Sequence, residues 1–236
     1  MKESIWSAIA TSLTDEIASG HYRPGDRLPT EAALAARFGV NRHTVRHALG
    51  ALAERGIVHS RQGAGVFVAQ RQTDYPLGRR VRFHQNVLAA GQTPSRRISR
   101  TETRPCDTAE ARALGLKPGD AVHVVEGLSL ADGQPIAAFR SVLPAARFPS
   151  LLDQVRGTGS ITRALAAVGL TDYTRAETRL TAQLADPVLA VALSVRPGAP
   201  VMRTVAVNVG PDSMPVELGT TWFAGERVTL TVADQP

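Results

Sequence analysis

Apolar residues recur at every fourth position near the start of the chain, which predicts a helix with one buried face. These residues are Ile5, Ile9, Leu13 and Ile17. Gly20 can terminate this helix, and the stretch 21–29 is typical of a loop with a tight turn. Thr30 is a suitable N-cap for a second short helix that buries Leu34. The chain is therefore expected to begin with two helices separated by a loop.

A third helix and a hairpin are predicted to complete this first segment. Gly39 breaks the second helix, and Asn41 caps a third one that ends near Arg55. The buried stripe of the third helix consists of Val45, Ala48, Leu49 and Leu52. Two β-prone runs follow at 57–60 and 66–68, around a glycine-containing turn. This order of elements is that of a winged helix-turn-helix, in which the third helix enters the major groove of DNA.

The rest of the chain favours β structure. Apolar alternation covers the runs 122–130, 136–143, 174–184, 201–209, 216–223 and 228–232, with short helical patterns at 108–114, 161–168 and 187–193. Turn sequences at 132–133 and 210–212 join neighbouring runs as hairpins, so we expect an antiparallel-sheet α+β domain. We place the winged helix at 1–70, a linker and a first helix at 71–92, and the α+β domain at 93–236.

The positive charge of the chain is concentrated in one segment. The formal net charge is +6, and residues 71–104 alone hold eight Arg against two acidic residues. Among all the basic residues only Lys2 and Lys117 are lysine. The excess of Arg is consistent with a compositional habit, and also with bidentate contacts to phosphate and guanine. The distribution favours a polyanionic partner.

The sequence lacks the marks of several other protein classes. No run approaches the roughly 18 apolar residues of a membrane helix, and a secretory signal pattern is missing, so we expect a soluble, cytoplasmic protein without a membrane partner. Cys106 is the only cysteine, which excludes an internal disulfide and a Cys-based zinc site. The common nucleophile, metal-ligand and Walker A patterns are missing too. We therefore expect no cofactor, no metal and no catalytic residue.

The predicted third helix carries side chains that suit DNA. Arg42 and Arg46 are four residues apart on one exposed face, where a guanidinium can match guanine O6 and N7 or a phosphate. Asn41 and Thr44 stand at the start of the helix, whose free N–H groups suit phosphate oxygens. Gly63 would let the backbone of the wing approach closely. An Arg pair of this kind is also compatible with a solvated helix face.

Three stretches of the first segment resemble the DNA-binding domain of GntR-type regulators: YRPGDRLPTE at 22–31, LAARFGVNRHTVRHAL at 34–49 and GAGVFV at 63–68. By this resemblance Arg42, Thr44 and Arg46 contact double-stranded operator DNA, and Gly63 belongs to the wing. Some members of the family carry a further Arg where this chain has Ala32. The full set of expected DNA-binding residues is Thr30, Asn41, Arg42, His43, Thr44, Arg46 and Gly63. For His43 and its neighbour His47, solvation is the alternative.

The second half resembles the effector-binding (UTRA) domain of the HutC branch of GntR regulators, which has a fold similar to that of chorismate lyase. The resemblance is carried by the stretches 77–86, 139–142, 172–176 and 222–228, which within that branch look most like regulators of phosphonate metabolism. A small anionic effector, a phosphonate or a phosphate-bearing metabolite, is the implied ligand. A doubly charged tetrahedral head suits Arg forks and hydroxyl groups.

Arg140 is the leading candidate for the effector site from the residues themselves. Strict alternation would place it on one strand face with Ile136, Ala138 and Val142. A cation there must either pair with an acid such as Glu217 or meet an anion. Arg175 and Arg179 alternate with Glu177 in another predicted strand, which indicates either a salt-bridged ladder or ligand contacts.

Other candidates follow from the resemblance. Phe83 and His84 match the position where HutC-type sensors hold a ligand phosphate, as does Ser160 with Thr162, although Ser160 also suits a plain N-cap. Glu217 and Phe223 match residues of the pocket wall. Gly127 and Ser129 stand near the place of a paired Arg in the family, which disfavours a sugar phosphate.

Taken together, the residues and the resemblance predict a ligand-responsive, homodimeric repressor of phosphonate-uptake or phosphonate-degradation genes. Two alternatives remain at this point. One is a regulator that senses a sugar phosphate or a histidine-pathway compound. The other is a lyase-like enzyme, although fold alone does not carry function.

Overall fold

The computed structural model describes residues 4–61, 63–69, 72–80 and 82–232. The chain forms two compact units, Met1–Arg71 and Gln72–Pro236. Gln62 in the predicted hairpin turn, residue 70 at the end of the predicted winged helix, and residues 71 and 81 of the predicted linker segment lie outside the described part of the chain.

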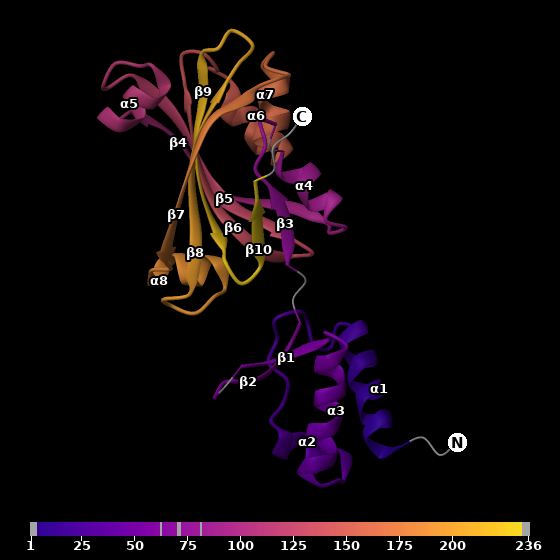
Figure 1. Cartoon of the computed structure of the whole chain (residues 1–236). Coiled ribbons are helices and arrows are strands. Elements are labelled where there is room, and N and C mark those ends of the chain that lie inside the picture. The colour runs from indigo at the N-terminus through magenta and orange to yellow at the C-terminus, as the bar shows by residue number, and fades with distance from the viewer. Residues whose placement is uncertain (1–3, 62, 70–71, 81, 233–236) are drawn as a thin grey trace. The chain divides into compact units, whose positions relative to one another are not determined.

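The first unit is a winged helix-turn-helix, as predicted (Figure 1). Its elements are α1 (Ile5–Ala18), α2 (Glu31–Phe38), α3 (Arg42–Glu54), β1 (Val58–Arg61) and β2 (Gly65–Val68). Hydrogen bonds from the helix starts set the boundaries, since Thr30 accepts one from the backbone N–H of Ala33 and Asn41 one from that of Thr44. Gly39, with φ of 67°, ends α2 in the left-handed conformation.

The three helices and the hairpin of this unit share one apolar core. Leu13 of α1, Leu34 of α2, and Val45 and Leu52 of α3 are fully buried in it. The strands β1 and β2 pair antiparallel and add Val58 and Val68 to this core. The burial of these stripes fixes which face of α3 remains exposed.

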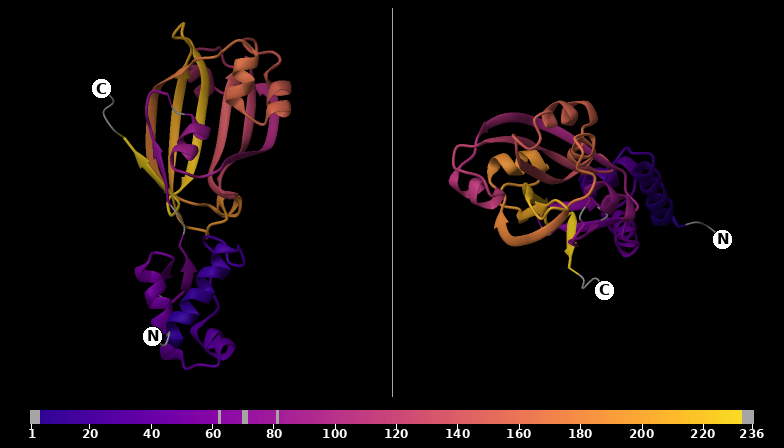
Figure 2. Two further views of the ribbon diagram at one scale, coloured as in Figure 1. Left: turned by 90° about the vertical axis from the view of Figure 1, so that its right-hand side faces the viewer. Right: turned by 90° about the horizontal axis from the view of Figure 1, so that it is seen from above.

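The second unit is built on a six-stranded antiparallel sheet (Figure 2). Its strands are β4 (Pro94–Pro105), β5 (Ala121–Ala131), β6 (Gln134–Pro144), β7 (Thr174–Leu184), β8 (Pro200–Val209) and β9 (Pro215–Ala224), in the order β4-β5-β6-β9-β8-β7. A separate parallel pair is formed by β3 (Thr73–Pro76) and β10 (Val228–Thr231). The α+β architecture therefore agrees with the prediction.

Helices cover both faces of this sheet. The helices of the second unit are α4 (Phe83–Ala89), α5 (Thr108–Leu114), α6 (Leu151–Thr158), α7 (Ile161–Ala167) and α8 (Pro187–Leu193). The face that carries Phe139, here called the pocket face, packs against α4, α6 and α7, which lie together in Figure 1. The opposite face, which carries Val142, packs against α5 and α8. Residues next to each other in a strand therefore lie in different environments.

The expected linker is partly wrong. Thr73 and Tyr75 of β3 are buried, and β3 pairs with β10 in register from Thr73 and Val228. The paired segment is only four residues long, so its alternation is too short to stand out from the polar residues around it. The first helix of the 71–92 segment is present as α4.

Candidate functional site

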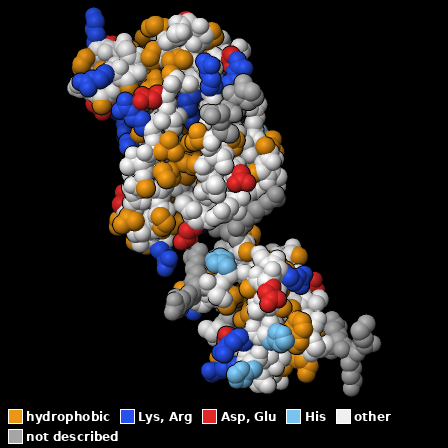
Figure 3. Space-filling model, in the orientation of Figure 1, with side chains coloured by type: hydrophobic (Ala, Val, Ile, Leu, Met, Phe, Trp, Pro, Cys, Tyr) orange, Lys and Arg blue, Asp and Glu red, His pale blue; other side chains and the backbone are white. Residues whose placement is uncertain are grey.

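The N-terminal turn of α3 forms an exposed polar surface in the first unit. Asn41 Oδ1 accepts hydrogen bonds from the backbone N–H of Thr44 at 2.8 Å and from its hydroxyl at 2.9 Å. Arg42 and His43 are exposed beside this cap. Arg and His side chains gather on the surface of this unit in the space-filling view (Figure 3). The turn presents cations next to the positive end of a helix, which suits an anionic backbone.

Arg46 does not lie free on this surface. Its Nε donates to Oε1 of Glu31 in α2 at 3.1 Å, and its Nη2 donates to Oε2 of the same carboxylate at 2.7 Å. Hydrogen bonding to Arg46 lowers the pKa of the Glu31 carboxyl, against a smaller opposing effect of burial. The pair orients a guanidinium that is still 62% exposed. Arg46 can thus present its remaining N–H groups in a defined direction.

Another side chain of α3 has a structural contact. His47 stacks on Trp6 of α1, with ring centroids 4.4 Å apart. This contact ties α3 to the start of α1, and His47 also remains exposed, so the solvated alternative is compatible with its position. His43 is exposed, as that alternative would have it.

Glycine shapes the hairpin. Gly63 has a φ of 72°, a conformation that glycine adopts without strain. Gly65 has a φ of 111°, and a Cβ there would lie 2.8 Å from Nε of Arg27. Arg27 also bridges to Phe67 in β2, so the hairpin is joined to the loop before α2. Thr30, one of the expected DNA-binding residues, is the N-cap of α2. The hydrogen bond that its hydroxyl accepts from Ala33 fixes the side chain without any contact to DNA.

The second unit contains a cavity of about 530 Å³ on the pocket face. It is bordered by α4, the start of β4 and the start of α7. Four of the predicted effector residues line it: Phe83, His84, Ser160 and Thr162. We call this space the outer cavity. Ser160 also accepts a hydrogen bond from the backbone N–H of Arg163 at 3.4 Å, so it caps α7 as well.

A smaller cavity of about 70 Å³ adjoins the outer one, and both are lined by Phe83, Arg96 and Thr162. We call it the inner pocket. It lies against the strands β6, β8 and β9, and its polar lining includes Arg175 and Glu217 from the predicted set. Tyr75 and Tyr173 border it, and burial raises the pKa of both phenols. The structure thus brings six of the nine predicted effector residues to two connected cavities.

Arg175 and Arg179 lie on opposite faces of the sheet, because the register of β7 against β8 shifts between Arg175 and Glu177. A bulge of this kind breaks the alternation that the prediction assumed. Arg175 points into the inner pocket. Arg179 donates to Glu177 at 2.7 Å in an exposed pair, so its predicted ligand role is wrong for this pocket and the salt-bridge alternative holds.

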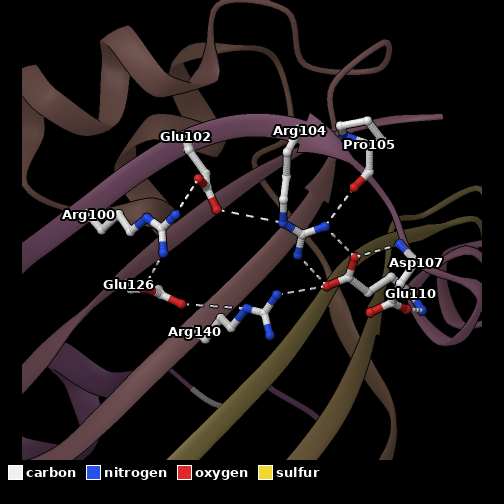
Figure 4. Close-up of polar contacts among 8 residues, drawn as sticks. All are labelled: Arg100, Glu102, Arg104, Pro105, Asp107, Glu110, Glu126 and Arg140. Atoms are coloured by element: carbon white, nitrogen blue, oxygen red, sulfur yellow. Dashed lines mark hydrogen bonds and ion pairs between the residues drawn. The ribbon is translucent and has the colours of Figure 1, made fainter. Parts of the chain in front are cut away.

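The placement of Arg140 in the pocket is also wrong. Arg140 lies on the opposite face of the sheet, 3.0 Å from Glu110 and 3.6 Å from Glu126 (Figure 4). The register of β5 against β6 shifts at Ser129/Leu130, so Ile136 does not share the face of Arg140 as strict alternation assumed. The first alternative, pairing with an acid, is the one the structure contains. The acid is Glu110 rather than Glu217.

Glu110 is the centre of this ion-pair network. Arg104 donates to its two carboxylate oxygens at 2.6 and 2.8 Å, and the Glu110 side chain is only 6% exposed. The hydrogen bond from Arg104 lowers the pKa of Glu110, and burial opposes this shift. Arg100 and Glu102 extend the network along β4 (Figure 4). Its charges balance, which is typical of a structural role.

Two further residues correct the predicted site. Phe223 packs against Tyr75 with ring centroids 5.0 Å apart and lines neither cavity, so it supports the pocket from behind. Arg96 was missed, although it lines both cavities. Its signal was the alternation of Pro94, Arg96 and Ile98, three residues that share one strand face.

The buried histidine and the cysteine of the second unit, His123 and Cys106, have hydrogen-bond partners within the fold. His123 is buried, and its ring nitrogens lie 2.8 Å from the Thr103 hydroxyl and 3.1 Å from the carbonyl oxygen of Phe148. Cys106 is buried and donates to the carbonyl oxygen of Lys117. Within the described ranges, His, Cys, Asp and Glu form no group that could hold a metal ion. In the same residues, no helix has the length and apolar character needed to cross a bilayer.

The chain combines a winged helix, whose α3 begins with basic residues, with an α+β domain that contains a charged cavity. This combination defines a class of proteins: DNA-binding transcriptional regulators that carry a small-molecule-binding domain. Comparison with known families agrees. Residues 6–68 match the family described as bacterial regulatory proteins, gntR family, and residues 89–229 match the UTRA domain. This chain belongs to the GntR family, in the branch with a UTRA domain, and it is a transcriptional regulator.

Individual relatives point the same way. An uncharacterized HTH-type transcriptional regulator of Rhizobium meliloti (strain 1021) is 38% identical over 98% of this chain and 96% of its own length. The probable transcriptional regulator PhnF of Escherichia coli (strain K12) is 44% identical over 54% of this chain and 53% of its own. The crystal structure of PhnF from Mycobacterium smegmatis matches with a TM-score of 0.65 and 25% identity, over 98% of this chain and 99% of that one.

Proposed function

We propose that this regulator is a cytoplasmic repressor that binds a palindromic operator as a homodimer and changes its affinity for DNA when a small anionic metabolite occupies the cavities. The observation that carries the DNA-binding part is the exposed start of α3. Asn41 caps it, Arg42 stands free of the core beside the cap, and the pair with Glu31 orients Arg46. We assign base or phosphate contacts to Arg42, Thr44 and Arg46, and backbone contacts to the wing at Gly63.

The homodimer follows from the size of the reading element. One recognition helix contacts only a few base pairs, and two-fold pairing doubles both the contacts and the length of the site. The second unit also exposes apolar side chains that self-association could cover. Leu184 is 70% exposed, and Val188 and Val191 of α8 are 80% and 81% exposed.

The effector part of the proposal rests on the charge of the cavities. Arg82 and Arg96 line the outer cavity together with Ser160 and Thr162, a combination that suits an oxyanion. The phosphonate pathway is supported by the resemblance of stretches 77–86 and 139–142 to regulators of phosphonate metabolism. The repressor role is supported by a relative named HTH-type transcriptional repressor PhnF in Mycolicibacterium smegmatis.

We further propose that the α+β domain binds its ligand without converting it. The relatives described above are transcriptional regulators, and a shared fold does not carry the lyase reaction. Incubation of the protein with chorismate should yield no 4-hydroxybenzoate. Formation of that product at a rate proportional to protein concentration would overturn this part.

The test of the proposed function is operator binding in solution. Selection from random DNA should return a palindrome, and the protein should footprint both halves of it at a stoichiometry of two chains per site. Expression of a reporter behind that palindrome should rise when the gene is deleted. An asymmetric footprint by a monomer, or a reporter that falls on deletion, would contradict the proposal.

A further inference from the structure

The inner pocket holds an arginine without a polar partner. The guanidinium carbon of Arg96 lies 5.0 Å from the ring centroid of Phe83 and 4.6 Å from that of Phe139, so two aromatic rings hold it. Its Nε is buried and has no hydrogen-bond partner among the described residues. The aromatic contacts set the position of the cation and leave its Nε–H unsatisfied.

A second arginine reaches the same pocket from β7. The Nε of Arg175 is also buried without a hydrogen-bond partner in the described part of the chain. Burial lowers the pKa of Arg175. Among the described residues, no carboxylate forms an ion pair with its guanidinium group. Glu217 in the same pocket acts on Arg175 electrostatically but forms no ion pair with it at hydrogen-bond distance among the described residues, so the cost of desolvation is only partly offset. Two such cations in one cavity indicate a site for an anion.

The third group of the pocket is a carboxylate. Glu217 is only 7% exposed, and it accepts hydrogen bonds from the Ser141 hydroxyl at 2.5 Å and from Nδ2 of Asn208 at 2.7 Å. Both contacts fix the carboxylate and leave it with further acceptor positions, since each oxygen has two lone pairs. Within the described structure no ion pair joins Glu217 to Arg96 or Arg175. The pocket therefore keeps charges of both signs separate.

Arg82 shows that contact with an aromatic ring does not by itself leave an arginine without polar partners. It also lies over an aromatic ring, 3.8 Å from the centroid of Tyr173. However, Arg82 donates to the carbonyl oxygen of Tyr173 at 3.0 Å and pairs with Asp172 at 3.7 Å. Arg82 is thus satisfied by the protein, whereas Arg96 and Arg175 are not.

We propose that the inner pocket binds a compact zwitterion, whose tetrahedral oxyanion accepts hydrogen bonds from Arg96 and Arg175 and whose ammonium group donates to Glu217. This inference rests on the proposed function, since it names the chemical class of the effector. The cavity of about 70 Å³ admits only a short chain between the two charged groups, and a larger remainder would extend into the outer cavity. Aminoalkyl phosphonates and phosphate esters of amino alcohols share this chemistry.

Gly127 of β5 explains why the two arginines of the anion site come from β4 and β7. A Cβ at Gly127 would lie 2.2 Å from the carbonyl oxygen of Arg97 and 3.0 Å from the ring of Phe139. A side chain from this position of β5 cannot be accommodated there, so β5 supplies no cation at this point. Arg96, on the neighbouring strand β4, and Arg175, on the far edge strand β7, provide the positive charge instead.

The first experiment measures binding to the full chain without DNA by isothermal titration calorimetry. The probes are 2-aminoethylphosphonic acid, O-phosphoethanolamine, ethylphosphonic acid and ethanolamine. We expect the protein to bind at least one of the two zwitterions. Ethylphosphonic acid and ethanolamine, which carry charge of one sign only, should bind to the protein at least about tenfold more weakly than that zwitterion. The two zwitterions distinguish a phosphonate from a phosphate ester. Equal binding of ethylphosphonic acid, or binding by none of the probes, would overturn the proposal.

Variants then test the assignment of each group. Arg96→Gln and Arg175→Gln should each weaken binding of the zwitterion by at least about tenfold. Glu217→Gln should remove the preference of the protein for the zwitterion over ethylphosphonic acid. Arg179→Gln, on the opposite face of the same strand as Arg175, is the matched control and should bind as the parent does. Circular dichroism checks folding, and Arg96→Lys and Arg175→Lys keep the charge if a Gln variant is unfolded. Parental affinity in the folded Arg96 and Arg175 variants would overturn the assignment.

Failure of this inference can be distinguished from failure of the proposed function. Operator titration without ligand measures DNA binding independently of ligand binding in the inner pocket. A protein that binds its operator and responds to a different metabolite keeps the proposed function and overturns the zwitterion assignment. A protein that binds the zwitterion but no operator does the reverse.

Discussion

Arg140 and Ser141 are neighbours in β6, yet their side chains lie on opposite faces of the sheet and pair with different acids. Arg140 contacts Glu110 at 3.0 Å in the ion-pair network, and Ser141 donates to Glu217 at 2.5 Å in the inner pocket. The two faces therefore have separate tasks. Substitutions on the network side should change stability, and substitutions on the pocket side should change ligand binding.

Removing Arg104 should destabilise the protein more than removing Arg140. Arg104→Ala deletes two hydrogen bonds to the buried Glu110 carboxylate, and we expect a loss of about 2 kcal/mol in the free energy of unfolding. Arg140→Ala leaves those bonds in place and should cost about 1 kcal/mol. Urea unfolding followed by circular dichroism measures both.

Arg179→Ala serves as the control for these stability measurements, because its pair with Glu177 is exposed and should leave the urea midpoint unchanged. A larger loss for Arg140→Ala than for Arg104→Ala would contradict the larger contribution assigned to the two hydrogen bonds from Arg104 to Glu110.

The sequence could predict most elements of the fold but not all of them. The caps at Thr30 and Asn41 and the apolar stripes of α1 and α3 were sufficient for the winged helix. Strand β4 was missed because most of its residues are polar and one face of it forms the ion-pair network. Helix α6 was missed because it lies in a short segment that buries Leu151, Leu152 and Val155 against the sheet. Only the tertiary structure shows what these two segments pack against.

The predicted effector site was less accurate for a related reason. A one-residue bulge reverses the face of every residue beyond it, and alternation cannot reveal where a bulge occurs. This reversal separates Arg175 from Arg179 in β7. Residues predicted from the family resemblance, such as Phe83 and Thr162, did not depend on alternation, and they line the cavities.

Loss of either recognition arginine should weaken operator binding. Arg42→Ala or Arg46→Ala should each reduce affinity by roughly 5- to 100-fold, with relaxed specificity at one base pair if the residue reads a base. If the residue holds a phosphate, affinity should fall evenly across sequences. Fluorescence anisotropy with operator and mismatched DNA at one salt concentration separates the two cases.

Arg55, the exposed C-cap of the same helix, provides the matched comparison for these variants. Arg55→Ala should bind operator within a factor of about two of the parent. Full affinity and specificity in the Arg42/Arg46 double variant would remove α3 from the interface.

Asn41→Asp should separate the capping role of Asn41 from its electrostatic environment. Aspartate is also a good N-cap, so the stability of the first unit should be kept, whereas Asn41→Ala should cost about 1 kcal/mol. The added negative charge beside Arg42 should repel DNA phosphates and reduce affinity by roughly fivefold or more. Thermal unfolding and operator titration of the three proteins measure the two effects. Unchanged operator affinity in Asn41→Asp would place phosphates away from this turn.

His123 should make the stability of the second unit depend on pH. Burial lowers the pKa of His123 below its ordinary value of 6.5, so the folded protein keeps the ring neutral. The unfolded chain takes up a proton as the pH falls below about 6.5, so stability is present above that pH and is lost on acidification. The slope should approach about 1.4 kcal/mol per pH unit between that value and the folded pKa.

The corresponding comparison is His123→Gln, which removes the titrating group. Urea unfolding of the two proteins over a pH series from neutral to mildly acidic should show a steeper loss in the parent. Parallel curves would mean that His123 does not carry this dependence.

The most direct test of the whole account is an operator titration with and without effector. The effector is the compound that most raises the melting temperature in a screen of phosphonates, phosphate esters and sugar phosphates. Effector should change operator affinity by roughly 5- to 150-fold, and operator should change effector affinity by the same factor, because coupling between two sites is reciprocal. Identical operator affinity at zero and saturating effector would contradict control of DNA binding by the cavities of the second unit.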